Sequence, residues 1–311
     1  RLQKLERMKS EFISIVSHEL RTPLTAIKNA MDIILSRKAG EMTENIEKFV
    51  SMGKRNAIRL SGIINDLLDI SKIEAGKMDF KFELIHVGPV IEYVKNNLAE
   101  VAKEKNLVIK YTPSGEDVEV YADSNRLEQV LTNLVSNAIK FTPDAGEIDI
   151  SSKVVNAREL QYDHCFEEDI KRLQGNYLLV CVEDHGIGIE RKDLNHVFDK
   201  FAQIENSLSR KVGGSGLGLP IARQLMESHN GAIWCDSEIN KGSKFYFVIP
   251  VANDRSNFVM IKKQLAQRAR SNGSTIAVIK IKSTNEVIEN LLRENNLLNK
   301  TYMTNSPVSY T

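Results

Sequence analysis

Four side chains near the start of the chain have the types and spacing that nucleophilic chemistry on a histidine would need. His18 lies on a predicted helix, Glu19 follows it, and Arg21 and Thr22 lie three and four residues further on. Positions three and four apart share a helix face, so Arg21 and Thr22 can reach a group attached to the imidazole. An imidazole with an unperturbed pKa of about 6.5 is largely neutral at pH 7 and can attack through a ring nitrogen. A surface histidine, or one satisfied in a core, is the alternative for His18 alone.

A second group of polar residues follows one side of the helix predicted over 126–141. Its members lie at steps of five, four and three residues: Glu128, Asn133, Asn137 and Lys140. Amide oxygens are ligands suited to Mg²⁺, a cation that usually shares its shell with waters and substrate phosphates. A lysine one turn further supplies a point charge for phosphate. A polar helix face in water is the alternative that this pattern alone leaves open.

Two glycine-rich runs come later in the chain. The first, Asp184–Ile189, directly follows an apolar strand, and the second, Gly213–Leu219, opens a predicted helix. Glycine permits positive φ and close backbone approach, and a glycine turn at a helix start presents free N–H groups to phosphate. Neither run has the spacing of the common phosphate-binding loop or of the dinucleotide fingerprint. Either run alone is a weak signal, because glycine turns are common.

The first 75 residues carry almost no strand signal. Apolar residues recur at three- and four-residue steps on both sides of Pro23, which predicts one helix with a kink at the proline. A break near 38–40 separates it from a second helix with the same spacing between Ile46 and Ile70. Two helices cannot enclose much core. The hairpin is therefore expected to dimerise into a four-helix bundle.

From Phe80 onward the pattern is mixed. Strands are predicted over 118–122, 147–155, 177–183, 232–237 and 244–250, and helices over 126–141 and 221–229. This order predicts an α/β sandwich with helices on one face of a mixed sheet. Residues 163–173 read as a polar, partly helical insertion. After 255 the pattern predicts a helix, a turn, a strand over 275–281 and another helix.

Composition limits the class of protein. The 311 residues include 42 Lys and Arg against 41 Asp and Glu, which gives a net charge of +1. This balance provides no electrostatic field strong enough to indicate binding to nucleic acid or to a membrane surface. Three widely spaced cysteines form no zinc pattern or disulfide framework, which favours a reducing, cytoplasmic compartment. No apolar run approaches the about 20 residues of a membrane helix. The chain starts abruptly on a helix, so we expect an upstream region that this sequence lacks. That region could tether the full-length protein to a membrane.

Taken in order, these segments resemble one family, the sensor histidine kinases of two-component signalling. The five matching motifs are the phosphoacceptor box at Ser17–Leu24, the N box at Asn133–Thr142, the first glycine box at Asp184–Ile189, the F box at Phe198–Phe201 and the second glycine box at Gly213–Leu219. The second glycine box has Ser215 where threonine is common. The resemblance covers about residues 1–250.

The resemblance implies three segments. Residues 1–76 would form the dimerisation and histidine-phosphotransfer hairpin, an antiparallel pair of helices that makes a dimeric four-helix bundle. Residues 77–252 would form the catalytic ATP-binding domain, an α/β sandwich of the kind shared with gyrase and Hsp90. Residues 253–311 match none of the motifs and are interpreted as a truncated or degenerate α/β segment.

The resemblance also implies roles for single residues. His18 would be the phosphoacceptor, Glu19 the acid that assists proton transfer, and Thr22 the residue that orients a water during dephosphorylation. Adjacent helix residues do not face one another, so Glu19 must reach sideways. A cap on the backbone freed by Pro23 is the alternative role of Thr22.

ATP and Mg²⁺ are the implied cofactors. Asn137, with Asn133 less firmly, would bind Mg²⁺; Lys140 would contact phosphate; Asp184 would accept a hydrogen bond from the adenine amino group. The second glycine loop and Arg210 would hold the triphosphate under a lid over 203–212. The full set of nucleotide residues is Asn133, Asn137, Lys140, Asp184, Gly186, Gly188, Arg210, Gly214, Ser215, Gly216, Leu217 and Gly218.

The expected function is therefore that of an ATP-dependent protein-histidine kinase. It would pass its phosphoryl group to an aspartate on a response-regulator receiver domain and would also dephosphorylate that regulator. In the related ATPases a glutamate four residues before the metal-binding asparagine activates water, whereas this chain has Asn133, whose amide cannot act as a base. A catalytically weak dimeric scaffold and a chaperone-like ATPase are the alternatives.

Overall fold

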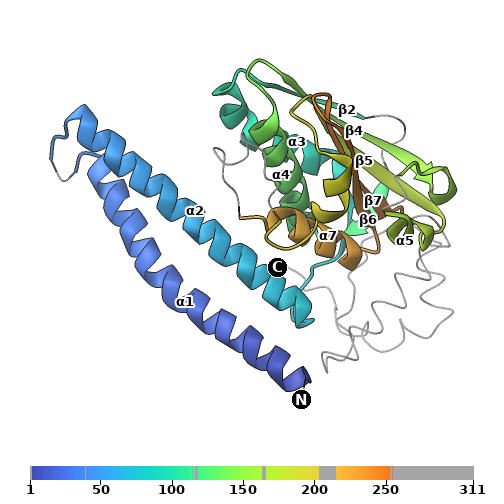
Figure 1. Ribbon diagram of the computed structural model, residues 1–311, viewed down its shortest axis with the longest axis horizontal. Coiled ribbons are helices and arrows are strands. Elements are labelled where there is room, and N and C mark those ends of the chain that lie inside the picture. The colour runs from blue at the N-terminus through green and yellow to red at the C-terminus, as the bar shows by residue number, and fades with distance from the viewer. Residues whose placement is uncertain are drawn as a thin grey trace, which may run out of the picture.

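The computed structural model describes residues 2–38, 40–113, 115, 118–162, 166–202, 215–252 and 254. A long helical hairpin comes first, and an α/β sandwich follows beside it (Figure 1). The predicted elements after 255 lie outside the described residues, as do Asp163–Cys165 in the insertion.

The hairpin consists of α1 (Leu2–Leu35) and α2 (Glu44–Glu74), which run antiparallel side by side (Figure 1). Helix α1 continues through Pro23 as one helix, bowed along its length rather than broken. Thr43 caps α2, because its hydroxyl accepts a hydrogen bond from the Ile46 N–H at 3.4 Å. Glu44 and Glu47 in the first turn add favourable charge at the helix N-terminus.

A single hairpin leaves most of its apolar seam in water. Among the side chains that the structure describes, Leu24, Ala57 and Ile64 form a small buried cluster between the helices, with Leu68 packed against them. Large apolar side chains remain exposed on both helices: Ile15, Leu20, Ile27 and Ile33 on α1, and Ile46, Phe49, Met52, Ile58 and Leu60 on α2. The Phe49 side chain, for example, is 69% exposed. The described part of the hairpin therefore encloses little core of its own.

The sandwich has a five-stranded mixed sheet in the order β2-β4-β5-β7-β6. Its strands are β2 (Val108–Pro113), β4 (Glu147–Asn156), β5 (Asn176–Asp184), β6 (Ala232–Glu238) and β7 (Gly242–Pro250). Strand β2 is parallel to β4, and the other neighbours are antiparallel. A separate two-stranded sheet pairs β1 (Glu83–His86) with β3 (Glu119–Ala122).

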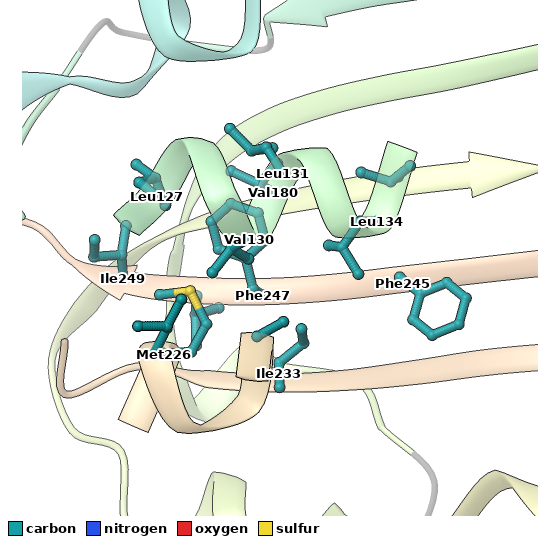
Figure 2. Close-up of a cluster of buried hydrophobic side chains, with 14 of the residues drawn as sticks. Leu127, Val130, Leu131, Leu134, Val180, Met226, Ile233, Phe245, Phe247 and Ile249 are labelled. Carbon is teal, nitrogen blue, oxygen red and sulfur yellow. The ribbon is translucent and has the colours of Figure 1, made fainter. Parts of the chain in front are cut away.

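Three helices cover one face of the main sheet: α3 (Val87–Lys103), α4 (Ser124–Phe141) and α7 (Gly218–Ser228) (Figure 1). Figure 2 shows how α4 packs, with Leu127, Leu131 and Leu134 directed at the strands. All three leucines are fully buried, as are Val180 on β5 and Phe247 on β7. The short helix α5 (Glu167–Lys171) belongs to the polar insertion, and two 3₁₀ turns lie at Ala157–Glu159 and Arg191–His196.

The structure confirms the predicted hairpin and sandwich, with two differences. Sequence analysis missed β1, α3 and β2, which together occupy most of residues 83–113. It also placed the start of α7 at Ile221, whereas the helix begins at Gly218. Pro220 lies in the first turn of this helix, where a missing N–H costs no intrahelical hydrogen bond, so the proline does not mark a break.

The buried face of β5 should dominate the stability of the sandwich. Val180→Ala removes two methyl groups from a fully buried site, and we expect it to lower the free energy of unfolding by about 2 kcal/mol. Denaturant unfolding followed through the fluorescence of Trp234, the single tryptophan, measures this.

Val108→Ala is the matched control. It makes the same change on a strand at a side chain that is 51% exposed, and it should leave the free energy of unfolding within about 0.5 kcal/mol of the unsubstituted value. Equal losses in the two variants would contradict the packing described for β5.

Candidate functional site

His18 lies on the exposed side of α1. Its side chain is 76% exposed and that of Glu19 78%, and the Glu19 carboxylate Oε1 lies 3.7 Å from the imidazole Nδ1. This distance is longer than a hydrogen bond, so the contact is electrostatic. It shows that Glu19 does reach sideways to its neighbour. The carboxylate approaches the ring nitrogen nearer the backbone and leaves the outer nitrogen, Nε2, facing elsewhere.

Arg21 and Thr22 take different directions from the same turn. The Arg21 Nη2 donates to Asn65 Oδ1 at 2.9 Å, which ties α1 to α2 one turn beyond His18. The Thr22 hydroxyl is exposed and donates a long hydrogen bond, 3.4 Å, to the His18 carbonyl. Pro23 frees the carbonyl four residues before it, that of Glu19, and Thr22 does not bond that carbonyl. The bond to His18 is therefore ordinary helix back-bonding.

Helix α4 positions the polar residues of the N box. Asp123 caps its first turn by accepting from the N–H groups of Asn125 and Arg126. With the apolar side packed on the sheet, Asn133, Asn137 and Lys140 lie next to that side and are half-buried. The expected alignment of these three along one helix is therefore present.

Two of these side chains have a defined environment. The Asn133 Nδ2 donates to the Gly218 carbonyl at 3.0 Å, so α4 is joined to the first residue of α7. The Lys140 Nζ lies 4.5 Å from the centre of the Phe141 ring. Burial lowers the pKa of Lys140, and the Arg59 guanidinium on α2 adds to this shift.

Asp184 is the last residue of β5 and is buried. Its Oδ1 accepts from the Gly186 N–H at 2.9 Å. Burial raises the pKa of Asp184 to about 6, against the opposing hydrogen bonds from the Gly186 and Ser243 backbones. A buried carboxylate that still has acceptor capacity is suited to a ligand N–H donor.

The first glycine turn lies directly on the end of α4. A Cβ at Gly186 would lie 2.5 Å from the Phe141 carbonyl oxygen and 2.6 Å from Asp184 Oδ1. Only glycine fits this approach. The N box and the first glycine box are therefore in contact, although Phe141 and Asp184 are 43 positions apart in the sequence.

The described part of the second glycine box, Ser215–Leu219, meets the other end of the site. The Ser215 hydroxyl accepts from the Leu217 N–H at 3.2 Å, and the Gly216 carbonyl accepts from the Phe201 N–H at 2.9 Å. The second contact links the glycine loop to the F box. Arg210 and Gly214, expected in this site, lie outside the described residues.

Acidic side chains of α2 contact the sandwich, and sequence analysis missed them. Asp66 Oδ2 accepts from the Ser215 hydroxyl at 3.1 Å, and Asp69 Oδ2 accepts from Gln129 Nε2 at 2.9 Å. Arg126 lies 3.4 Å from Asp69, and Glu74 forms an ion pair with Lys200 of the F box. Burial is the main cause that raises the pKa of Asp66. The sequence signal that could have indicated these contacts is the pair of acids Asp66 and Asp69, which lie three residues apart and therefore share one face of the helix.

The structure thus brings together the two glycine boxes, the N box and the F box. It does not bring His18 to them, because α2 lies between α1 and the sandwich (Figure 1). Among the described helices, none has the length and apolar character that crossing a bilayer requires.

Comparison with known proteins agrees with this arrangement. Residues 8–76 match the family model of the His Kinase A (phospho-acceptor) domain. Residues 122–253 match that of the histidine kinase-, DNA gyrase B-, and HSP90-like ATPase. The two models cover the hairpin and the greater part of the sandwich.

Individual relatives are sensor kinases. The chain is 31% identical over 255 residues to the sensor histidine kinase WalK of Bacillus subtilis, covering 82% of this chain and 39% of WalK. It is 33% identical over 246 residues to the autoinducer 2 sensor kinase/phosphatase LuxQ of Vibrio vulnificus, covering 79% of this chain and 27% of LuxQ. The chain therefore spans about two fifths or less of these relatives.

Among solved structures, full-length ShkA in complex with AMPPNP has the same fold, with a TM-score of 0.61. The two are 24% identical, and the match covers 78% of this chain and 46% of ShkA. Both the hairpin with its histidine and the sandwich with its nucleotide motifs are accounted for by one family. The chain belongs to the sensor histidine kinases of two-component signalling, of which it carries the phosphoacceptor and ATP-binding domains.

Proposed function

We propose that this chain is an ATP-dependent protein-histidine kinase, which phosphorylates His18 and passes the phosphoryl group to an aspartate of a response regulator. The observation that carries the proposal is the convergence of both glycine boxes on α4, the first at Phe141 at its end and the second at Asn133 in its middle, in a chain that also presents an exposed histidine paired with an acid. Residues 1–76 form the phosphotransfer hairpin and 77–252 the catalytic domain; 253–311 are a separate segment.

The nucleotide occupies the polar side of α4. Asp184 accepts from the adenine amino group, and Gly186 and Gly188, whose backbones lie against the Phe141 and Glu238 carbonyls, form the turn beside the base. Lys140 contacts phosphate, and the loop formed by Gly214, Ser215, Gly216, Leu217 and Gly218 holds the triphosphate together with Arg210. Free N–H groups at the start of α7 are suited to this charge.

The residues present fit Mg²⁺. Asn137, with Asn133 as a second candidate, supplies a hard oxygen ligand. In the part of the chain that the structure describes, no group of three or more His, Cys, Asp or Glu residues is placed so that it could hold a metal ion. A cation held by one or two protein oxygens completes its shell with water and substrate phosphates, which is the usual state of Mg²⁺. Bound there, it would neutralise the charge of the transferring phosphoryl group.

At His18 the two ring nitrogens have separate tasks. The Nδ1–H proton faces Glu19, which favours the tautomer with a lone pair on Nε2. Nε2 attacks the γ-phosphorus, the Nε2–P bond forms, the bond from phosphorus to the ADP oxygen breaks, and Glu19 takes the Nδ1 proton. Positioning and charge neutralisation do most of the work in such a transfer.

Transfer needs a change of arrangement, because α2 separates His18 from the nucleotide site of its own chain. Either the contacts of Asp66, Asp69 and Glu74 open, or a second copy supplies the other half. The exposed apolar seam of α1 and α2 supports a homodimer, in which a four-helix bundle buries it. The receiver domain of the regulator docks beside His18.

Asn133 favours a kinase over an ATPase. Its amide donates to Gly218 and has no basic group with which to activate water. Phosphate therefore goes to His18.

The phosphoacceptor assignment is tested by His18→Gln. We expect this change to abolish acid-labile, alkali-stable labelling from radioactive ATP, because no other group replaces the imidazole nucleophile, while ATP affinity stays the same. His86→Gln, a change of an exposed histidine on β1, should keep the labelling. Labelling that persists in His18→Gln would refute the assignment.

The role of Asp184 predicts a pH dependence. The ionised carboxylate is a much stronger acceptor for the adenine amino group than the protonated carboxyl, and a pKa raised to about 6 means that protonation of Asp184 weakens binding as the pH falls through that value. Between pH 7.5 and pH 5.5 the ionised fraction, and with it the ATP affinity measured by calorimetry, should fall about fourfold.

Asp184→Asn supplies the control. At pH 7.5 it should bind ATP about tenfold or more weakly, a difference of about 1.4 kcal/mol for each tenfold. Its amide does not titrate, so only the titration of the ATP phosphates should remain in its pH profile. Parallel pH profiles for the two proteins would argue against adenine recognition by Asp184.

Thr22 separates the two activities toward the regulator. Its exposed hydroxyl, one turn beyond His18, can hold the water that attacks the aspartyl phosphate. Thr22→Ala should slow dephosphorylation of the regulator several-fold while His18 still labels, and Thr22→Ser should retain much of the activity. If dephosphorylation and His18 labelling were lost together, the role of Thr22 would instead be structural, in holding the backbone of α1 near Pro23.

A further inference from the structure

Lys105 lies in the connection between α3 and β2, and its ammonium group binds backbone carbonyls at the end of α4. Its Nζ donates to the carbonyl oxygens of Ile139, Lys140 and Thr142 at 2.9, 3.0 and 3.1 Å. An ammonium has three donors, and all three are engaged. The side chain is half-buried, so these bonds are partly shielded from water.

Lys105 binds carbonyl groups at the C-terminal end of α4. The last carbonyls of a helix have no intrahelical partner and carry partial negative charge. The Ala138 carbonyl accepts from both the N–H and the hydroxyl of Thr142, the residue that follows α4. Lys105 binds the carbonyls of Ile139 and Lys140 in the helix and that of Thr142 beyond it. The last turn of α4 therefore keeps its shape through a cation supplied by a distant segment.

This turn is also where the two halves of the nucleotide site meet. Lys140 belongs to it, Asn137 lies one turn before it, and the Phe141 carbonyl abuts the Gly186 turn that orients Asp184. A shift of a few tenths of an ångström at this turn would move Gly186 or open a gap beside it. Lys105 touches none of the groups assigned to ATP, so it acts through the backbone.

The base of Lys105 is itself fixed. Its carbonyl accepts from the Ala145 N–H at 2.9 Å, and the Val108 N–H donates to the Gly146 carbonyl at 3.2 Å. The connections α3–β2 and α4–β4 are thus joined at the lysine itself and again three residues after it. Because its backbone is held and its three hydrogen bonds are directed, Lys105 fixes the end of α4 in place. These three hydrogen bonds are called the clamp below.

From this geometry we infer that Lys105 is a positioning residue of the nucleotide site, one that holds the end of α4 against the first glycine turn. The inference rests on the proposed function, because it concerns the same ATP site. Loss of the clamp should weaken ATP binding more than it slows phosphoryl transfer at saturation.

The test compares three variants of the whole chain. Lys105→Met keeps the length of the side chain and removes its donors, Lys105→Arg keeps the charge, and Lys103→Met removes one positive charge from an exposed site two residues earlier. The measurements are the KM for ATP and the kcat of His18 labelling, the ATP affinity by calorimetry, and amide hydrogen exchange over 139–146 and 184–188.

We expect Lys105→Met to raise the ATP KM and dissociation constant about tenfold with kcat within about twofold, and to speed exchange in both segments. Lys105→Arg should recover part of the affinity, because a planar fork cannot copy three diverging donors. Lys103→Met should match the unsubstituted chain.

Two outcomes overturn the inference in different ways. Unchanged ATP affinity in Lys105→Met, with only a lower unfolding temperature, would make Lys105 a stabilising cap without a role in positioning. Failure of the unsubstituted chain to bind ATP would remove the proposed function and this inference with it.

Discussion

Helix α4 packs its apolar side on the sheet, and each part of the nucleotide site takes its position from that contact. Leu127, Leu131 and Leu134 are fully buried against the strands (Figure 2), which fixes the rotation of the helix. Once the rotation is fixed, Asn133 and Lys140 must lie next to the apolar side. The first glycine turn then meets one end of the helix through Phe141, and Gly218 meets it through Asn133.

Much of this arrangement was predictable from sequence, because the signals are local. The apolar spacing of α4, the glycines that allow close approach and the histidine in its polar segment can each be read within ten to twenty residues. The hairpin was predictable for the same reason. What the sequence could not supply is which separate segments touch. The bond from Asn133 to Gly218 and the three bonds of Lys105 join residues tens of positions apart.

The missed elements have physical explanations as well. Helix α3 has apolar residues at helical spacing from Val87 to Ala102, but Gly88 and Pro89 at its start read as a break. Proline is tolerated in the first helical turn, where its missing N–H would have no partner. Strand β2 is short and at the edge of the sheet, and it owes its conformation to pairing with β4. Both depend on tertiary contacts more than on local pattern.

Two kinds of contact hold the second half of α2 against the sandwich. Ile70 is part of the main apolar core and Ile73 packs against that core. On either side of these two residues in the sequence, Asp69 lies 3.4 Å from Arg126, and Glu74 forms an ion pair with Lys200. Attraction between partly exposed charges weakens as electrolyte is added, whereas apolar burial does not depend on charge. Added salt would therefore weaken the two ionic contacts of this joint and leave its hydrocarbon contacts in place.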